Sequence, residues 1–347
     1  MTGLTRNAGS IVGMGQVMLA AALWATVGVA TRIVPDASLL SASVLGLARM
    51  AFGGLAILCI ACLATPDLFR ALRRLSPGRL VEFALSSAVF QVCLFQSFVL
   101  LGVTTTVVVT VCLPPLISAA TLQLRGVCPL SRGTVLALGL AVSGVVVFGS
   151  GELSGTISGT RLAGMGVAVL AAVAFVRMSS AARVLTREAG PLVVAGVGLS
   201  LASLVLAASL PMTGLQAPLA AAPVTGPMIA LVLYLGLGPT ALAYLLYCSG
   251  IAKCRSTSVG LTASMLEPAI AALLAYALLH ETLSAQEVIG CGLIFLGMLS
   301  LWWTERRAPA VVPPGGPVDG QQDRQRYLLK DPLGQDPRQA ALVPGNG

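Results

Sequence analysis

Residues 226–250, GPMIALVLYLGLGPTALAYLLYCSG, form a long apolar stretch without a single charged side chain. A helix rises about 1.5 Å per residue, so roughly twenty such residues cross a hydrocarbon core of about 30 Å. The whole chain has this character, because 56% of its 347 residues are hydrophobic and only 10% are charged. A soluble protein would carry about a quarter charged residues. The sequence therefore predicts an all-α integral membrane protein.

Nine further stretches of similar length predict ten transmembrane helices in all. The expected spans are 13–34, 39–64, 80–101, 103–124, 133–150, 161–182, 190–210, 226–250, 257–279 and 286–304. The first span is followed by nine others, so we expect an uncleaved anchor rather than a signal peptide. Residues 1–12 are a short N-terminal segment. Residues 305–347 are rich in proline and glycine and lack an apolar period, which predicts a disordered tail.

The basic residues lie on one side of this expected topology. Arginine and lysine fall in the gaps after spans 2, 4, 6, 8 and 10, whereas the opposite side holds only Arg32 and Arg161. Cytoplasmic loops carry the excess of positive charge, so we expect a multi-pass protein of the cell (inner or plasma) membrane with both termini in the cytoplasm. Topology thus accounts for the formal charge of +8, and no nucleic-acid partner is expected.

An internal repeat divides the chain into residues 13–150 and 161–304. A shift of 153 residues, the separation of Pro115 and Pro268, also aligns Leu113 with Leu266 and Gly144 with Gly297. The front of each half matches as well, and there Trp24 aligns with Phe175. Each half holds five expected spans, an odd number, so the second half enters the membrane from the opposite face. Two inverted five-helix repeats allow two packings, one open to each side, which is the basis of alternating access.

The second half resembles a known transporter family. The stretch Gly238–Tyr247, a basic turn, Leu266-Glu-Pro268 and His280-Glu-Thr-Leu-Ser284 are similar to the second repeat of the EamA-type transporters of the drug/metabolite transporter superfamily. The resemblance covers about residues 15–304 and is strongest from 236 to 300. It implies a five-plus-five helix fold and the export or exchange of amino acids, metabolites, nucleosides or toxic compounds.

The sequence departs from this family at one position. The first repeat commonly carries a glutamate after its fourth span, but the residue aligned with Glu281 is Cys128. A role of that glutamate in both halves is therefore not expected.

Charged residues at membrane depth are the first candidates for a functional site. Arg49 in span 2 and Glu267 in span 9 are expected near the midplane, and Arg177 in span 6 somewhat closer to the cytoplasm. Such a charge costs at least about 2.5 to 3.5 kcal/mol on the insertion scale and usually lines a bundle interior or a cavity. Two interpretations remain open. Either Glu267 is a proton or cation site and Arg49 a counter-ion or carboxylate binder, or the two form a structural pair.

Polar and aromatic side chains extend the candidate site. Gln91 and Gln96 in span 3 either give a cavity its polarity or hold helices together. Trp24 is a candidate for lining the cavity, with ordinary packing as the alternative, and Tyr244 belongs to the family-like stretch of span 8.

Backbone breaks are the last candidates. Pro115, Pro268 and the Gly238-Pro239 step leave carbonyl groups without their usual donors. Such breaks are tolerated where protein or water satisfies the backbone, so they either flank the substrate path or are ordinary kinks.

Enzyme and metal chemistry find no support in the residues. His280 is the single histidine, so no zinc site with two histidines can form within the chain, and no glycine cluster ends in Gly-Lys-Ser/Thr. The Cys59-x-x-Cys62 pair lies on an apolar helix without a second pair, and we expect it to fill the core. No enzymatic activity, cofactor or metal is expected.

These features together predict a secondary transporter that moves small organic metabolites by alternating access, with export as the expected direction. The alternatives are a non-transporting scaffold or regulator and, less favoured, an intramembrane enzyme. Protons are a candidate coupling ion, because proton exchange requires a titrating residue such as Glu267, whereas facilitated diffusion requires none. The expected partners are thus a small-molecule substrate and the lipid bilayer, with the oligomeric state left open.

The topology can be tested directly. We predict that residues 65–79 face the cytoplasm and residues 211–225 the outside, because the basic gaps share one side. A membrane-impermeant thiol reagent applied to intact cells should label a single cysteine at position 216 and not one at position 74. Labelling of position 74 from outside would overturn the orientation.

Overall fold

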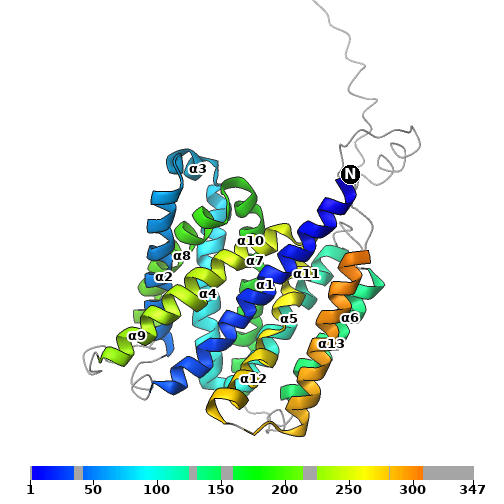
Figure 1. Ribbon diagram of the computed structural model, residues 1–347. Helices are drawn as coiled ribbons and strands as arrows, with labels where there is room; N and C mark the ends of the chain where they lie inside the picture. Colours follow the sequence, from blue (N-terminus) through cyan, green and yellow to red (C-terminus); the bar gives the residue numbers. More distant parts are fainter. Residues whose placement is uncertain are drawn as a thin grey trace, which may run out of the picture. The chain divides into compact units, whose positions relative to one another are not determined.

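The computed structural model describes residues 2–34, 42–124, 131–149, 159–213, 225–280 and 282–307, and every regular element within these ranges is a helix (Figure 1). The elements are, in order, α1 (Thr2–Ile33), α2 (Ala42–Ala64), α3 (Leu68–Arg74), α4 (Pro77–Leu101), α5 (Val103–Leu124), α6 (Arg132–Gly149), α7 (Gly159–Ala189), α8 (Pro191–Thr213), α9 (Gly226–Leu235), the π-helix η2 (Gly236–Leu242), α10 (Ala243–Lys253), α11 (Thr257–Ser264), α12 (Glu267–Leu279) and α13 (Ala285–Arg307).

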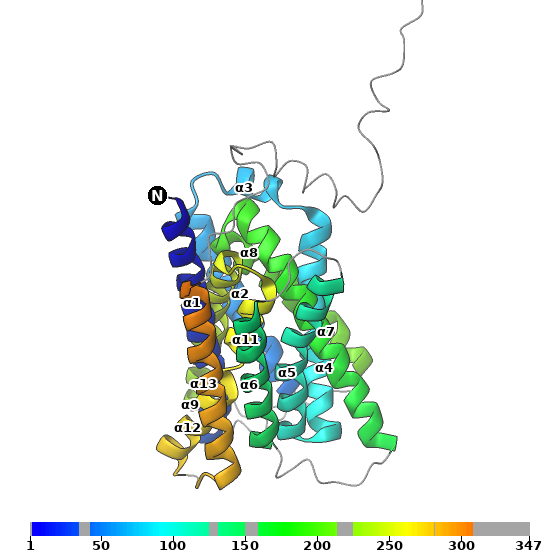
Figure 2. The same cartoon turned by 90° about the vertical axis from the view of Figure 1, so that its right-hand side faces the viewer.

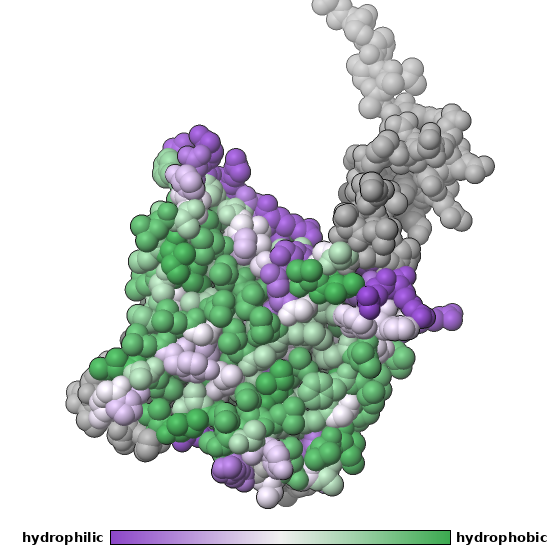
Figure 3. All heavy atoms as spheres, viewed as in Figure 1, coloured by the Kyte–Doolittle hydropathy of each residue, from purple (hydrophilic) through white to green (hydrophobic). Residues whose placement is uncertain are grey.

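Nine spans in the described part of the chain are long and apolar enough to cross a membrane. Two of them are composite: α9, η2 and α10 form Gly226–Lys253, and α11 and α12 form Thr257–Leu279. Hydrophobic residues cover the visible face between hydrophilic ends, as a bilayer requires (Figure 3). The all-α, multi-span architecture is thus confirmed. The remaining expected span is the shorter apolar helix Arg132–Phe148, so the count of ten stays a prediction.

Four helix pairs, each with one member from either half of the chain, make the most extensive contacts. They are α1 with α10, α2 with α8, α4 with α7, and α6 with α13 (Figures 1 and 2). If the halves are inverted repeats, α7 is the equivalent of α1, and α10 is the equivalent of α4. The α1–α10 pair is then equivalent to the α7–α4 pair, whereas α2–α8 and α6–α13 each join two equivalent helices. This is the pairing that a two-fold axis between the halves would produce. The repeat boundaries themselves stay a prediction.

Glycines set the distance between the paired helices. A Cβ atom at Gly144 of α6 would lie 2.8 Å from the carbonyl oxygen of Gly290 of α13, and one at Gly290 would lie 2.7 Å from that of Gly144. Gly13 of α1 and Gly250 of α10 approach each other in the same way, at 2.7 and 2.6 Å. Lipid tails are as apolar as leucine, so close van der Waals packing of small residues holds such helices together.

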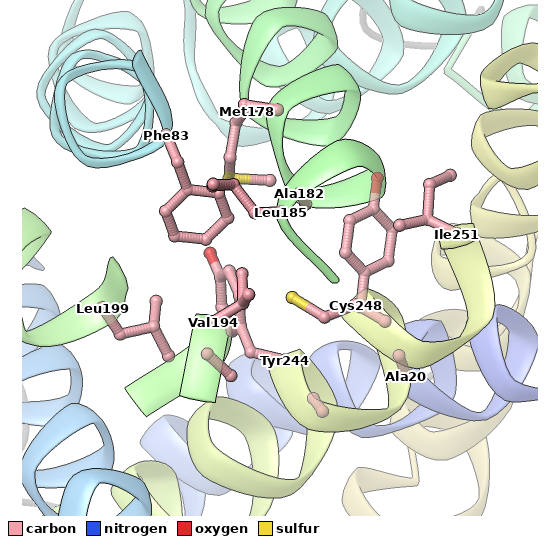
Figure 4. Packing of buried hydrophobic residues seen from close by; sticks show 14 of the residues in the cluster. Ala20, Phe83, Met178, Ala182, Leu185, Val194, Leu199, Tyr244, Cys248 and Ile251 are labelled. Carbon is pink, nitrogen blue, oxygen red and sulfur yellow. The ribbon is translucent and has the colours of Figure 1, made fainter. Parts of the chain in front are cut away.

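The largest buried cluster lies between α1, α4, α7, α8 and α10. Phe83, Met178, Leu185, Leu199 and Ile251 have exposed fractions of 0% there, and Figure 4 shows their side chains in the region where α4, α7, α8 and α10 meet. The Cys59 and Cys62 side chains, by contrast, are exposed on α2. Our expectation that they fill the core is wrong, because an apolar helix in lipid presents apolar residues on both its packed and its lipid-facing sides.

Proline acts differently in the two halves. Helix α5 continues through Pro114 and Pro115, whereas the second-half span breaks at a turn between α11 and α12, immediately before Glu267 and Pro268. Pro239 lies inside the π-helix η2, whose wider turn accommodates the missing donor. The backbone irregularities expected from the sequence thus take the form of a helix break at Pro268 and a π-helix at Pro239. At Pro115 the helix is not broken.

The close approach of α6 and α13 leads to a stability prediction. We expect Gly290→Ala to lower the thermal unfolding midpoint of the detergent-purified protein, since overpacking costs about 1 to 3 kcal/mol. Gly292→Ala on the same helix is the matched control, because a Cβ there meets no atom of the described residues within 4 Å. Alanine stabilises a helix by roughly 0.5 to 1 kcal/mol relative to glycine, so the control should be neutral or stabilising. Equal midpoints for the two variants would contradict the packing.

Candidate functional site

A partly open cavity of about 450 Å³ lies between the two halves of the chain. Its walls come from α1, α2, α4 and α5 of the first half, and from α7 and α9 to α12 of the second. Small-molecule sites in proteins have volumes of about 300 to 1,000 Å³. The cavity is therefore large enough for a metabolite.

The cavity is displaced toward one end of the bundle. Thr31 near the end of α1, Leu45 near the start of α2, Phe98 near the end of α4 and Val107 near the start of α5 all line it. These helix ends lie at the opposite end of the bundle from α3, which carries the basic residues Arg73 and Arg74 (Figure 1). On the topology expected from the charges, this is the outer end.

Arg49 of α2 and Glu267 of α12 both line this cavity. No hydrogen bond or ion pair joins these two described residues. Glu267 is the first residue of α12, where the helix dipole favours a negative charge. The direct contact that a structural pair between α2 and α12 would need is thus not formed in this conformation, and both charges lie at the cavity.

Two buried polar atoms on residues that line the same cavity lack a hydrogen-bond partner among the described residues. They are Oε1 of Gln91 and Nε1 of Trp24. Gln91 has an exposed fraction of 0%, and its Nε2 lies 3.1 Å from the Met50 sulfur. A buried polar group left unpaired costs about 1 to 3 kcal/mol, so proteins seldom keep one without a reason. Here the two atoms are an acceptor and a donor on residues of the cavity wall.

An aromatic wall closes the inner end of the cavity. Trp24 packs edge-on against Phe175 with 6.3 Å between ring centroids and against Tyr244 with 5.5 Å, and Phe90 lies 5.0 Å from Phe175. Trp24 and Phe175 are the residues that the repeat aligns. Two equivalent residues touch each other only near the axis that relates them, so this contact lies where a two-fold axis between the halves would pass.

Other sequence candidates lie elsewhere. Arg177 is 56% exposed and forms an ion pair with Glu82 of α4 at 2.6 Å, away from the cavity wall. Gln96 and Pro115 are also absent from that wall, as are Gly238 and Pro239. Glu281 and Cys128 lie outside the described residues. The structure thus gathers Trp24, Arg49, Gln91, Tyr244, Glu267 and Pro268 at one cavity.

Sequence reasoning missed part of the wall. Phe90, Phe95 and Phe98 of α4 line the cavity together with Leu94. Phe90, Leu94 and Phe98 recur at a spacing of four residues, which places them along one side of the helix and is the signal that was present in the sequence. No group of three or more metal-binding side chains is found within the described ranges.

Comparison with known proteins agrees with this architecture. Residues 162–303 match the model of the EamA-like transporter family. A solved crystal structure superposes with a TM-score of 0.69 at 20% sequence identity, and the alignment covers 86% of this chain and 98% of that one. This likeness establishes the fold alone. No curated protein matches the sequence. Residues 162–303 of this multi-span membrane protein are therefore similar to the EamA-like transporter family of the drug/metabolite transporter superfamily.

Proposed function

We propose that this protein is a secondary transporter that binds a small organic metabolite between its two halves and carries it across the cell membrane, outward, by alternating access. The observation that carries the proposal is the cavity itself, which has walls from both halves and contains two opposite charges without a direct contact between them. Both termini would lie in the cytoplasm. The two halves, residues 13–150 and 161–304, would act as the inverted repeats.

The cavity chemistry favours a substrate that combines a carboxylate, a cationic group and an apolar body. The planar guanidinium of Arg49 suits a carboxylate, and the Glu267 carboxylate suits an ammonium group or a proton. The aromatic wall around Trp24 offers π-faces to an apolar or cationic part of the same molecule. Amino acids and related metabolites combine these features.

Proton coupling would follow from competition at Glu267. A carboxylate buried at membrane depth is poorly solvated as an anion, so it is best retained when a cation or a proton accompanies it. If the substrate and the proton occupy this group in turn, proton entry drives substrate exit. The same cavity without such competition would support facilitated diffusion.

Counterflow tests the transport proposal. Liposomes that contain the purified protein and are preloaded with an unlabelled zwitterionic metabolite should transiently accumulate the labelled compound, whereas protein-free liposomes should not. An untargeted comparison of metabolites retained by cells with and without the gene selects the compounds. Failure to exchange any retained compound would reject the transporter and favour a scaffold or regulator.

Glu267 can be examined with an isosteric substitution. We predict that Glu267→Gln keeps the size-exclusion profile of the purified protein but lowers the transport rate at least about ten-fold or abolishes its pH dependence, because the amide cannot exchange a proton. Glu287→Gln is the matched control, since Glu287 is a partly exposed carboxylate away from the cavity wall that accepts hydrogen bonds from Ser284 at the start of α13.

An unchanged rate and pH profile in Glu267→Gln would refute the coupling role. Poor folding of that variant, restored by adding Arg49→Met, would identify the two charges as a structural pair instead.

A further inference from the structure

The two sides of the region between the halves differ in packing. On the outer side, Leu94, Phe95 and Phe98 of α4 border the open cavity. The repeat aligns them with residues of α10, which are Tyr247, Cys248 and Ile251. These counterparts have exposed fractions of 0%. The α4 residues of the first half therefore border the cavity, whereas the equivalent α10 residues of the second half are buried by packing.

Counterparts of the α1 wall are closed in the same way. The alignment of Trp24 with Phe175 also places Gly28 on Ser179 and Thr31 on Ala182. Gly28 and Thr31 line the cavity, whereas Ser179 and Ala182 of α7 have exposed fractions of 0%. Ala182 belongs to the buried cluster in which α7 meets α10, and Figure 4 shows it among Leu185, Cys248 and Ile251.

One hydrogen bond joins the two helices inside this cluster. The Tyr247 hydroxyl lies 2.6 Å from Oγ of Ser179. Ser179 donates its own proton to the Phe175 carbonyl at 2.6 Å, so Tyr247 is the donor in the bond between α10 and α7. Both side chains are fully buried, and separating the helices would break this bond.

Two arginines of α7 hold the end of α10 nearest the basic segments. Arg183 donates to the carbonyl oxygens of Ile251 at 3.2 Å and Arg255 at 2.9 Å, and Arg187 donates to that of Ala252 at 3.1 Å. The last carbonyls of a helix have no intrahelical donors, and cations are favourable beside them. The arginines therefore close the region at its surface, beyond the Tyr247–Ser179 bond.

We propose that these α7–α10 contacts form the closed gate of a second cavity, which opens on the side of the basic loops, with the Tyr247–Ser179 bond as its latch. Opening separates the α1–α10 pair from the α4–α7 pair on that side and brings the Cys248 thiol into contact with water. The cavity around Arg49 closes in the same motion. The inference rests on the proposed transport function, since it names the second face of the same substrate path.

The native Cys248 allows a direct test. A variant that keeps it as the only cysteine is reconstituted in vesicles and treated with a small impermeant methanethiosulfonate reagent on each side. We expect slow labelling from the side of the basic loops only. Tyr247→Phe should accelerate it about two- to ten-fold, the effect of losing one net hydrogen bond. It leaves no buried donor unpaired, because Ser179 already donates to Phe175.

Two further variants keep the result interpretable. Cys291 of α13 is buried in a separate cluster and serves as the control cysteine. In a protein that keeps Cys291 as its only cysteine, Tyr247→Phe should leave the labelling rate unchanged. Ser179→Ala removes the latch from the other helix and should also accelerate Cys248 labelling, which covers the case that Tyr247→Phe folds poorly.

Labelling of Cys248 from the opposite side, or identical rates with and without each substitution, would overturn the gate. Counterflow in the same vesicles separates the two proposals. Counterflow with Cys248 unreactive in every variant rejects the gate and leaves the transporter standing. Sided, latch-dependent labelling without any counterflow supports the opening of this region and rejects transport.

Discussion

Close packing without a hydrophobic driving force between helices is the constraint on which this structure depends. In lipid every backbone polar group must be bonded within the chain, so the spans are helices, and their association relies on surfaces that can approach very near. The Gly144–Gly290 and Gly13–Gly250 contacts meet this requirement in two different helix pairs. Each pair joins the first half of the chain to the second. The most extensive helix contacts are thus between the halves rather than within either half. The space that this packing leaves between the halves is where a cavity can persist.

The polar groups of that cavity are tolerated for the same reason. Arg49 and Glu267 would each be costly against lipid, but both line a partly open space between the halves. Gln91 and Trp24 keep one buried polar atom each without a partner among the described residues. The physical basis for the proposed zwitterionic substrate is the pair of separated opposite charges, because Arg49 suits a carboxylate and Glu267 suits an ammonium group.

The gate proposal adds a conformational side to this picture. The α7–α10 region is closed by a buried hydrogen bond and by arginines at a helix end, whereas its counterpart on the other side is open. Two packings of similar energy need a contact that is strong enough to hold one state and weak enough to break. The Tyr247–Ser179 bond adds about one net hydrogen bond to the apolar packing where α7 meets α10, so it biases the equilibrium between the two packings without fixing it.

The sequence by itself determined the class of protein. Uninterrupted apolar runs fixed the helical, multi-span fold, because lipid permits little else, and the rarity of intramembrane charge selected Arg49 and Glu267. Tertiary structure decided which polar residues reach the cavity. Gln91 lines it and Gln96 does not, since five residues turn a helix by about 140° beyond a full revolution. Arg177 meets Glu82 instead. Hydropathy could not separate these cases, because helix sides that face lipid and sides that face other helices are equally apolar.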